Sequence, residues 1–378
     1  MKKICFVLSA GNMKGSNGAF LELTDSLDKE KFKPYVILPF NAGIVSELEA
    51  RNIDFRIIDY RWWMHERGES FKSRVKKSII NFLALPRVCR QIIKWQCDLI
   101  YTNTIVINMG LMSSIILRKP HIFHVHEFGF EDHGLKFDFG KRISLWFANV
   151  FTRNFIFVSN ALADGYVNFI TTRKSRVVYQ SVALSKKTPA NNNSKRYSLQ
   201  CVIIGRITQG KGQEDAIEAI SILLQQEVDC GLWIVGEGEA FYKEYLKKNI
   251  VRRNMQNNII FCGWHENPLA FMKQADIVLV CSRQEAFGRV TVEAMLAGKP
   301  VIGSRSGGTK EIIKDEFNGL LYTVGNPQEL AQKIKYLYEN PNLIFSLGNN
   351  AQKWAEKEFT SKHYSNTISN ILEKILHK

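Results

Sequence analysis

The sequence predicts an α/β protein with two doubly wound domains, each containing a parallel sheet covered by helices on both faces. Three observations support this prediction. Short apolar runs alternate with helical patterns along the whole chain, as in parallel sheets joined by helical crossovers. The chain of 378 residues is too long for one ordinary core and suits two. The composition changes once, at the polar, Asn-rich stretch 185–198, which reads SKKTPANNNSKRYS.

The expected domain boundaries follow from this change in composition. We expect an N-terminal domain at 1–184, a linker at 185–198 and a C-terminal domain at 199–360, followed by a final helix at 361–378. Doubly wound sheets bind their ligands beyond the carboxyl ends of the strands. We therefore expect a binding cleft between the two domains.

The expected strands are short runs of apolar and β-branched residues. In the N-terminal half they are 3–9, 35–39, 98–102, 121–125 and 155–158. In the C-terminal half they are 200–205, 232–236, 258–262, 276–281 and 300–303. The first of these runs is short and leads directly into a glycine-rich turn, so we expect a buried strand there rather than a signal peptide.

The charge and cysteine content narrow the class of partner. The formal net charge is +15, and most of the excess lies in the first 180 residues. This bias favours an anionic partner, such as a phosphorylated substrate or an acidic membrane surface, with general solubility as the alternative. Nucleic acid is disfavoured, because no zinc-finger spacing or RNA-binding signature is present. The seven cysteines form no CxxC pair, so we expect small buried side chains in a reducing compartment.

Two stretches bear on membrane contact. The uncharged stretch 99–117 contains several Thr and Asn residues, so we expect a buried strand and helix there rather than a membrane span. Residues 61–94 contain nine Lys or Arg and two acids, interleaved with aromatic and aliphatic side chains. That pattern suits an interfacial membrane helix. A solvated helix covering the N-terminal core is the alternative.

The motif GRITQGKG (205–212) indicates a phosphate site in the C-terminal half. It follows an expected strand and places Arg206 and Lys211 beside glycines, including Gly205, that allow close approach of the backbone. It lacks the P-loop pattern. A solvated turn with incidental cations is the alternative.

A second motif, EAFGRVTVEAMLAG, places Glu285 in a strand-to-helix loop and Glu293 near the first turns of the following helix. Helix N-termini present free N–H groups and a partial positive charge. A plain helix start explains one acidic residue. Two at this spacing, around Phe287 and Gly288, indicate a binding site.

Three further patterns are weaker. IVGEGE (234–239) lacks the third glycine of a dinucleotide loop, so we expect a turn. Gly18 lies at a helix start after a glycine-rich loop, where a phosphate or an empty tight turn would fit. His121, His124 and His126 alternate along a strand, but no acidic or cysteine cluster completes a metal site. We expect His126, at the strand's carboxyl end, to make a polar contact with substrate.

Together these motifs resemble the retaining glycosyltransferases of the GT-B fold, specifically family 4, also called glycosyl transferases group 1. The resemblance covers nearly the whole chain. It is most specific in the two glutamates, in the SGG of 306–308 with Glu311 following, and in GRITQGKG. The family's fold has two Rossmann-like domains facing a central cleft. By the same resemblance, the helix 361–378 packs back onto the N-terminal domain.

The resemblance also implies a donor site and a catalytic set. Arg206 and Lys211 would hold the diphosphate of the donor, Glu293 the ribose, and Glu285 the hydroxyls of the transferred sugar. His126 would face the reacting sugar. The implied catalytic residues are His126, Glu285, Arg206 and Lys211, and the implied donor-binding residues are Gly18, Gly205, Arg206, Lys211, Glu285, Phe287, Gly288, Arg289, Val290 and Glu293.

Two positions depart from the family's usual pattern. Asn17 stands where a first glycine is common, and YQSVAL (179–184) replaces a frequent Asn-Gly-Val-Asp turn. Both departures lie outside the C-terminal donor motifs. They therefore bear on details of the N-terminal domain and leave the expected donor site unchanged.

The function implied is retaining transfer of a hexose-type sugar from a nucleotide-diphosphate sugar, with UDP favoured, to a lipid-linked glycan of a surface polysaccharide such as lipopolysaccharide or capsule. No divalent metal or other cofactor is expected, and the expected location is cytoplasmic with peripheral contact to an anionic membrane. The alternatives are a soluble transferase that makes a small glycoside or storage glucan, and a catalytically silent partner subunit. Intact Arg206, Lys211, Glu285 and Glu293 argue against the last.

Overall fold

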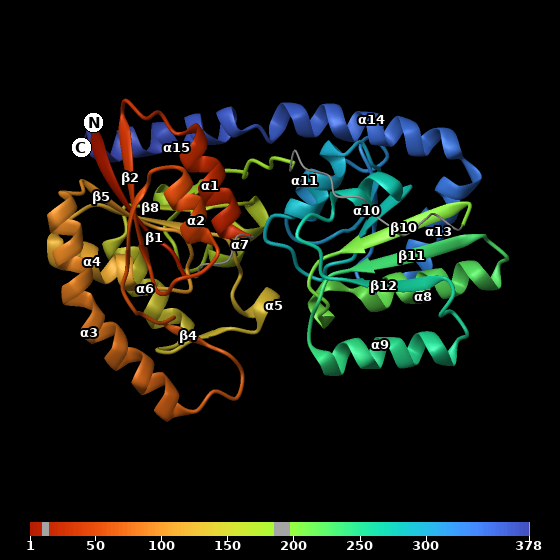
Figure 1. Cartoon of the computed structure of the whole chain (residues 1–378), viewed down its shortest axis with the longest axis horizontal. Coiled ribbons are helices and arrows are strands. Elements are labelled where there is room, and N and C mark those ends of the chain that lie inside the picture. The colour runs from red at the N-terminus through yellow and green to blue at the C-terminus, as the bar shows by residue number, and fades with distance from the viewer. Residues whose placement is uncertain (10–14, 185–196, 378) are drawn as a thin grey trace. The chain divides into compact units, whose positions relative to one another are not determined.

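A computed structural model describes residues 1–9, 15–184 and 197–377 of the chain (Figure 1). The chain divides into two compact units, Met1–Ser181 with the segment that begins at Ser361, and Val182–Thr360. The predicted linker at 185–198 lies outside the described residues except for its last two. Each unit is described by itself below.

The N-terminal unit is built on a seven-stranded parallel sheet in the order β3-β2-β1-β5-β6-β8-β9. Its central strands are apolar and buried, as expected for a sheet covered on both faces. The bounds are β1 Lys2–Val7, β2 Phe32–Leu38, β3 Asp54–Ile57, β5 Leu99–Thr102, β6 His121–Val125, β8 Asn154–Phe157 and β9 Ser175–Val177. A separate antiparallel pair joins β4 (Met64–His65) to β7 (Lys136–Phe137).

Helices and turns connect these strands. They are α1 Ser16–Ser26, α2 Ile44–Ala50, α3 Phe71–Trp95, α4 Met109–Leu117, α5 Phe130–His133, α6 Lys141–Phe151, α7 Asn160–Tyr166 and the 3-10 turn η1 Thr172–Lys174. The longest, α3, begins at the N-cap Ser70, whose hydroxyl accepts a hydrogen bond from the Ser73 amide, and ends at Gln96 in a left-handed conformation. None of the helices in the described residues is long and apolar enough to cross a membrane.

The last helix, α15 (Ser361–Leu376), belongs to the N-terminal unit although 179 residues of the other unit precede it in sequence. Tyr364, Ile368 and Leu372 recur every four residues and are buried in the same core as residues of α1 and β1. This one-sided pattern explains why the helix is stable only when packed. Burial of its apolar face attaches the C-terminal segment to the N-terminal core.

The C-terminal unit contains a six-stranded parallel sheet in the order β12-β11-β10-β13-β14-β15. The strands are β10 Leu199–Ile204, β11 Cys230–Val235, β12 Ile259–Gly263, β13 Ile277–Val280, β14 Val301–Ser304 and β15 Leu320–Tyr322. The helices are η2 Gln209–Lys211, α8 Gln213–Gln225, α9 Ala240–Arg252, α10 Leu269–Gln274, α11 Arg289–Leu296, α12 Thr309–Ile312, α13 Pro327–Glu339 and α14 Pro341–Glu358.

The two parallel sheets confirm the predicted fold class, and every expected strand is present. The strands that the sequence did not reveal are short or at the edges. β3 alternates Asp54 and Arg56 with apolar residues at the sheet edge, and β4 and β7 have two residues each. Such segments carry too few apolar positions for periodicity to detect. Six of the seven cysteines are buried and Cys262 is half-buried, which agrees with the role expected of them.

Candidate active site

In the C-terminal unit, three loops carry the predicted donor residues and the SGG motif. They follow β10, β13 and β14, which are neighbours in the sheet. Carboxyl ends of adjacent parallel strands lie at one edge, where doubly wound sheets bind ligands. The local sequence explains how these loops come into contact, because glycines remove side chains at each point of closest approach.

The GRITQGKG loop packs against the end of β13. A Cβ on Gly212 would lie 2.0 Å from the Cys281 carbonyl oxygen, and the φ of Gly212 is 65°. The Arg283 amide donates to the Gly210 carbonyl at 2.8 Å. Only glycine fits position 212, because any side chain would collide with the neighbouring strand. This close packing carries Lys211, the last residue of η2, toward the β13 loop.

Lys211 and Glu285 form an ion pair at this edge. The Lys211 Nζ lies 2.8 Å from Glu285 Oε2, and both side chains are partly buried. Arg206 lies in the same GRITQGKG loop, is exposed, and its carbonyl accepts a hydrogen bond from Gln213 at 3.0 Å. The structure therefore joins Lys211 to Glu285 and leaves the guanidinium of Arg206 accessible at the surface of the loop.

The SGG motif shapes the loop that carries Glu285. The Gly308 amide donates to the Glu285 carbonyl at 2.7 Å. A Cβ on Gly307 would lie 2.1 Å from that carbonyl oxygen, and one on Gly308 would lie 2.4 Å from the Phe287 carbonyl oxygen. The two glycines therefore allow the β13 and β14 loops to meet backbone to backbone. This contact positions the main chain of Glu285.

The α11 helix begins directly after this loop. Gly288 has a φ of 106° and precedes Arg289, the first helical residue. The N-terminus of a helix favours anions, because the helix dipole is positive there; in α11 this is the turn that begins with Arg289 and Val290. Phe287 points away from this site, since its ring is buried against Phe359 with centroids 5.8 Å apart. Glu293 lies one turn into α11 and is half-buried.

The GxG of 236–238 has a packing role as well. A Cβ on Gly236 would lie 1.9 Å from the Gly205 carbonyl oxygen, and one on Gly238 would lie 1.9 Å from that of Ile207. The β11 loop thus lies directly against the loop after β10. The expected turn is present, and its glycines are explained by loop-to-loop contact.

In the N-terminal unit, His126 is held by two side chains that were not predicted as site residues, one of them in the YQSVAL stretch. Its Nε2 lies 3.0 Å from Asn103 Oδ1, and its Nδ1 lies 2.6 Å from Gln180 Nε2. Both contacts are satisfied by the neutral imidazole that carries its proton on Nε2. Asn103 also donates to the Ser16 carbonyl at 3.0 Å, at the start of α1. The only sequence signal for Asn103 was its position after an expected strand.

Gly18 lies in the first turn of α1, beside the buried Asn17. Most of the glycine-rich loop before it, residues 10–14, lies outside the described residues. Asn103 connects this helix start to His126, so the structure brings the two N-terminal site residues to one network. The remaining predicted residues all belong to the C-terminal unit.

Glu127, next to His126, is a buried carboxyl group that ties two loops together. Its Oε1 accepts hydrogen bonds from the Thr104 hydroxyl and, at 2.8 Å, from the Ile105 amide. Burial raises the pKa of Glu127 to about 7. Tyr166 donates to the Glu127 carbonyl at 3.1 Å, so the main chain beside His126 is fixed as well.

The alternating histidines reflect core packing. His121 bonds Thr102 at 2.7 Å and Thr152 at 3.0 Å. His124 bonds Tyr101 at 2.9 Å. Burial lowers the pKa of both His121 and His124 to about 3, which keeps them neutral. In the described part of the chain, no group of three or more His, Cys, Asp or Glu side chains is arranged to hold a metal ion.

Comparison with known proteins identifies the chain. Residues 14–186 match the model described as Glycosyltransferase Family 4, and residues 185–354 match Glycosyl transferases group 1. An uncharacterised glycosyltransferase of Methanocaldococcus jannaschii is 27% identical over 86% of this chain and 92% of its own. A lipopolysaccharide core biosynthesis glycosyltransferase of Rhizobium meliloti is 25% identical over 45% of this chain and 48% of its own.

A solved structure shares the fold over the whole chain. Anabaena HepE, solved with UDP, has a TM-score of 0.80 and 24% identity, covering 99% of this chain and all of its own. The same protein has also been solved with UDP-glucose, with a TM-score of 0.79. The two adjoining family matches, read with the two parallel sheets, show that the chain belongs to glycosyltransferase family 4, a retaining family of GT-B fold.

Proposed function

We propose that this enzyme transfers a hexose from a UDP-sugar to a lipid-linked glycan acceptor, with retention of anomeric configuration. The observation that carries the proposal is the Lys211–Glu285 pair, 2.8 Å apart, beside the start of α11. This edge combines cations, the N-terminus of a helix and carboxylates. A diphosphate needs the first two, and sugar hydroxyls are bound well by the third.

The donor diphosphate would lie between Arg206, Lys211 and the first amides of α11. An ammonium group has three N–H donors, so Lys211 can bind a phosphate oxygen while it remains paired with Glu285. Glu285, held by that pair, would accept hydrogen bonds from hydroxyls of the transferred sugar. Glu293, one turn along α11, would accept hydrogen bonds from both hydroxyls of the ribose.

The reaction breaks the bond between the anomeric carbon and the diphosphate oxygen and forms one from that carbon to the acceptor oxygen. The acceptor's proton passes to a donor phosphate oxygen. Negative charge therefore grows on the leaving diphosphate, where the fixed cations and amides stabilise it. Loss of one such donor costs about 3–4 kcal/mol in oxyanion-hole systems. These residues supply that stabilisation, and no divalent metal or other cofactor is assigned a role.

A UDP-sugar is supported by the solved relative that shares the fold, which was crystallised with UDP and with UDP-glucose. A lipid-linked acceptor is supported by the relative named for lipopolysaccharide core synthesis and by the basic N-terminal unit. The enzyme would then work at an anionic membrane surface on the cytoplasmic face, where such donors are made.

Thermal unfolding with UDP, GDP, ADP and CDP, each with and without EDTA, tests the donor site. A nucleotide at a hundredfold excess over its dissociation constant adds about 2.7 kcal/mol of stability. We expect a shift with UDP that EDTA leaves unchanged and that Glu293→Ala reduces. Lys31→Ala serves as the control. It breaks an ion pair of the other unit, between Lys31 and Glu373, whose length of 2.8 Å equals that of the Lys211–Glu285 pair. A shift with another nucleotide alone would overturn the assignment of UDP.

A further inference from the structure

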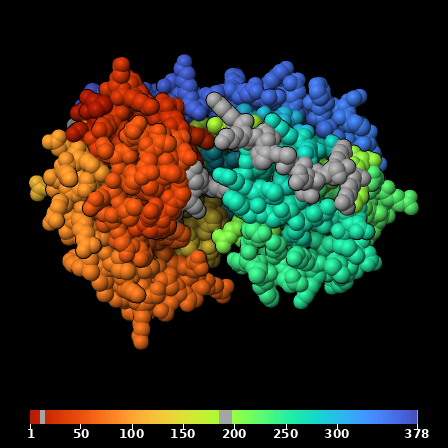
Figure 2. Space-filling view, in the orientation of Figure 1, coloured from red at the N-terminus to blue at the C-terminus, as the bar shows by residue number. Residues whose placement is uncertain are grey.

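The outer face of α3 is apolar and exposed. Successive turns present large hydrophobic side chains to solvent, and the neighbouring helix α6 adds more. These exposed residues, the α3–α6 surface, are Phe71, Val75, Ile79, Phe82, Leu83, Phe139, Ile143, Trp146 and Val150. Figure 2 shows α3, in orange, on the outside of the N-terminal unit. Phe82 is 75% exposed and Trp146 is 63% exposed, although such residues are normally buried.

A pocket of about 360 Å³ opens within this surface. Its walls come from α3, α4 and α6 and are mostly apolar, with Leu85, Met109, Met112 and Phe147 among the residues that line it. Phe82, Ile143 and Trp146 belong both to this lining and to the exposed surface. A volume in this range suits a small apolar ligand or part of a longer chain.

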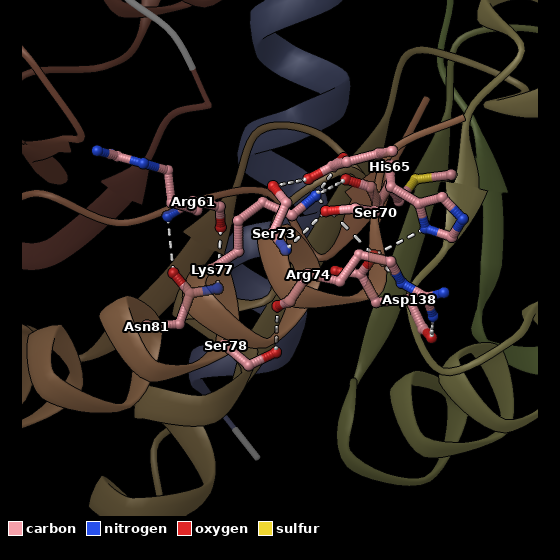
Figure 3. Close-up of polar contacts among 11 residues, drawn as sticks. Arg61, His65, Ser70, Ser73, Arg74, Lys77, Ser78, Asn81 and Asp138 are labelled. Atoms are coloured by element: carbon pink, nitrogen blue, oxygen red, sulfur yellow. Dashed lines mark hydrogen bonds and ion pairs between the residues drawn. The ribbon is translucent and has the colours of Figure 1, made fainter. Parts of the chain in front are cut away.

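The inner face of α3 is fixed to the rest of the unit by polar contacts (Figure 3). The buried carboxylate of Asp138 lies 2.8 Å from His65 Nδ1 and 3.4 Å from Arg74 Nε. Lys77 donates to the Met64 carbonyl at 2.9 Å and pairs with Glu69 at the same distance. Arg74 and Lys77 are therefore used to anchor the helix. The outer face has a rigid support, so its exposure is a stable feature of the fold.

The charges on the helices of the α3–α6 surface all have one sign. The two acids beside these helices, Glu69 and the pocket-lining Asp138, pair with Lys77 and Arg74. The 25 residues of α3 contain seven Lys or Arg and no acid. α4 carries no charged residue, and α6 adds Lys141 and Arg142 without an acid. At about 100° per residue, the apolar outer positions of α3 are flanked on one side by basic ones. These exposed basic residues are Lys72, Lys76, Arg87, Arg90 and Lys94.

We propose that the α3–α6 surface docks on an anionic phospholipid bilayer, with its aromatic side chains inserted among the lipids and one acyl chain in the pocket. An apolar strip flanked by basic side chains is the pattern of an interfacial helix. A second copy of this chain would bring a surface of the same positive sign, so charge disfavours self-association through this face. The inference extends the proposed function by naming where membrane contact occurs, and its test does not depend on sugar transfer.

Co-sedimentation of the full chain with vesicles tests the docking. We expect binding to equimolar phosphatidylcholine and phosphatidylglycerol, and at least tenfold weaker binding to phosphatidylcholine alone. Each basic residue at an anionic surface contributes about 1 kcal/mol, so Lys72→Glu with Lys76→Glu should weaken binding tenfold or more. The matched control is Lys247→Glu with Lys248→Glu, which reverses the charge of an exposed pair on α9 of the other unit.

A second test variant, with its matched control, measures how much the apolar side chains contribute to vesicle binding. Phe82→Ser with Trp146→Ser should weaken vesicle binding about tenfold or more, because each side chain inserts apolar area into the bilayer. Phe241→Ser with Phe345→Ser is the control, since these residues are 88% and 79% exposed in the C-terminal unit. The proposal would be overturned by an equal loss of vesicle binding in test and control variants, by equal binding of wild-type protein to neutral and anionic vesicles, or by no binding to any vesicle.

The pocket is tested with a soluble short-chain phosphatidylglycerol below its micelle concentration. Wild-type protein should unfold at a higher temperature when this lipid is added. Met112→Trp, which fills a half-buried wall position, and Ile143→Glu, at the exposed rim, should each abolish the shift. An unchanged shift in Ile143→Glu, or a dimer in sedimentation that Phe82→Ser with Trp146→Ser dissociates, would contradict the assignment. The UDP shift should survive in both variants, so failure of docking and failure of the donor site are distinguishable.

Discussion

Lys211 Nζ lies 2.8 Å from Glu285 Oε2, although the two residues are 74 positions apart in the sequence. The contact exists because glycines at positions 212, 307 and 308 let three loops meet at the edge of one sheet. The pair joins the group expected to hold the diphosphate to the group expected to hold the sugar. A change to either residue should therefore affect both parts of the donor.

We expect Lys211→Ala and Arg206→Ala each to lower kcat by about 10²–10³, the loss measured when one charge-stabilising donor is removed from a transition state. Nucleotide affinity should fall less, since the charge on the diphosphate grows only as the bond breaks. Initial rates with the donor sugar and titration with UDP separate the two effects. Lys31→Ala, which breaks a surface pair of the same length, should keep wild-type turnover.

Gly212→Ala should destabilise the C-terminal unit and weaken UDP binding, because the new Cβ would lie 2.0 Å from the Cys281 carbonyl oxygen. Gly134→Ala provides a matched control with almost the same φ, 67° against 65°, and open space around its Cβ. In the control, the free energy of unfolding should fall only by the cost of placing alanine in the left-handed conformation, about 1–2 kcal/mol. Denaturant unfolding of both variants measures the difference. Equal losses would mean that conformation, and not the close loop contact, requires Gly212.

Asn103→Ala should lower turnover up to about tenfold while leaving UDP affinity unchanged, because it removes the neutral hydrogen bond that orients His126, together with the bond to the Ser16 carbonyl. The comparison variant is Asn149→Ala, which removes an exposed hydrogen bond to Thr171. Measurement of kcat and of the UDP dissociation constant tests this prediction. A tenfold loss of UDP affinity in Asn103→Ala would show that the residue acts on the donor site instead.

Glu127 should make stability depend on pH. Its folded pKa of about 7 exceeds the ordinary 4.5, so the folded state binds a proton that the unfolded state has released between these values. The contribution of Glu127 to stability is therefore complete below pH 4.5 and is lost as pH rises to about 7. Relative to Glu127→Gln, wild-type protein should lose about 1.4 kcal/mol per pH unit across this window.

Urea unfolding of wild-type protein and Glu127→Gln at several pH values measures that difference. Subtracting one curve from the other removes the contributions of His121 and His124, whose lowered pKa values act in both proteins and in the opposite direction. A constant difference in unfolding free energy from pH 5 to pH 8 would contradict the raised pKa of Glu127.

Sequence reasoning recovered most of the fold because parallel strands buried on both faces consist of continuous apolar runs. β5 and β13 are of this kind, and β1, β6 and β10 are mostly apolar with a few polar residues such as His124 and Gln200. It missed β3, β4, β7, β9 and β15, which have two to four residues each. In segments this short, pairing with a neighbouring strand decides the conformation, and local pattern contains little information about it.

The donor motifs were visible in the sequence because each is a local pattern. Arg206 and Lys211 share one loop, and Glu285 and Glu293 share the next loop and helix. The partners of His126 were not visible. Asn103 and Gln180 follow separate strands and are 77 residues apart. Gln180 lies in the YQSVAL stretch, but no local pattern predicts that either side chain contacts His126. The GxG of 236–238 predicted a turn, and the structure adds that its glycines are required by contact with the loop after β10.

The sequence by itself determined the fold class and the family resemblance, and it predicted the donor residues, because these depend on periodicity and on motifs within about thirty residues. Only the tertiary structure decided which loops meet, which glycines are required for packing, and which residues hold His126. It also distinguished the two faces of α3, since anchoring by Asp138 uses Arg74 and Lys77 and leaves the apolar face exposed. Such contacts join residues that are distant in sequence, so local propensity does not predict them. They form only when folding buries these residues together.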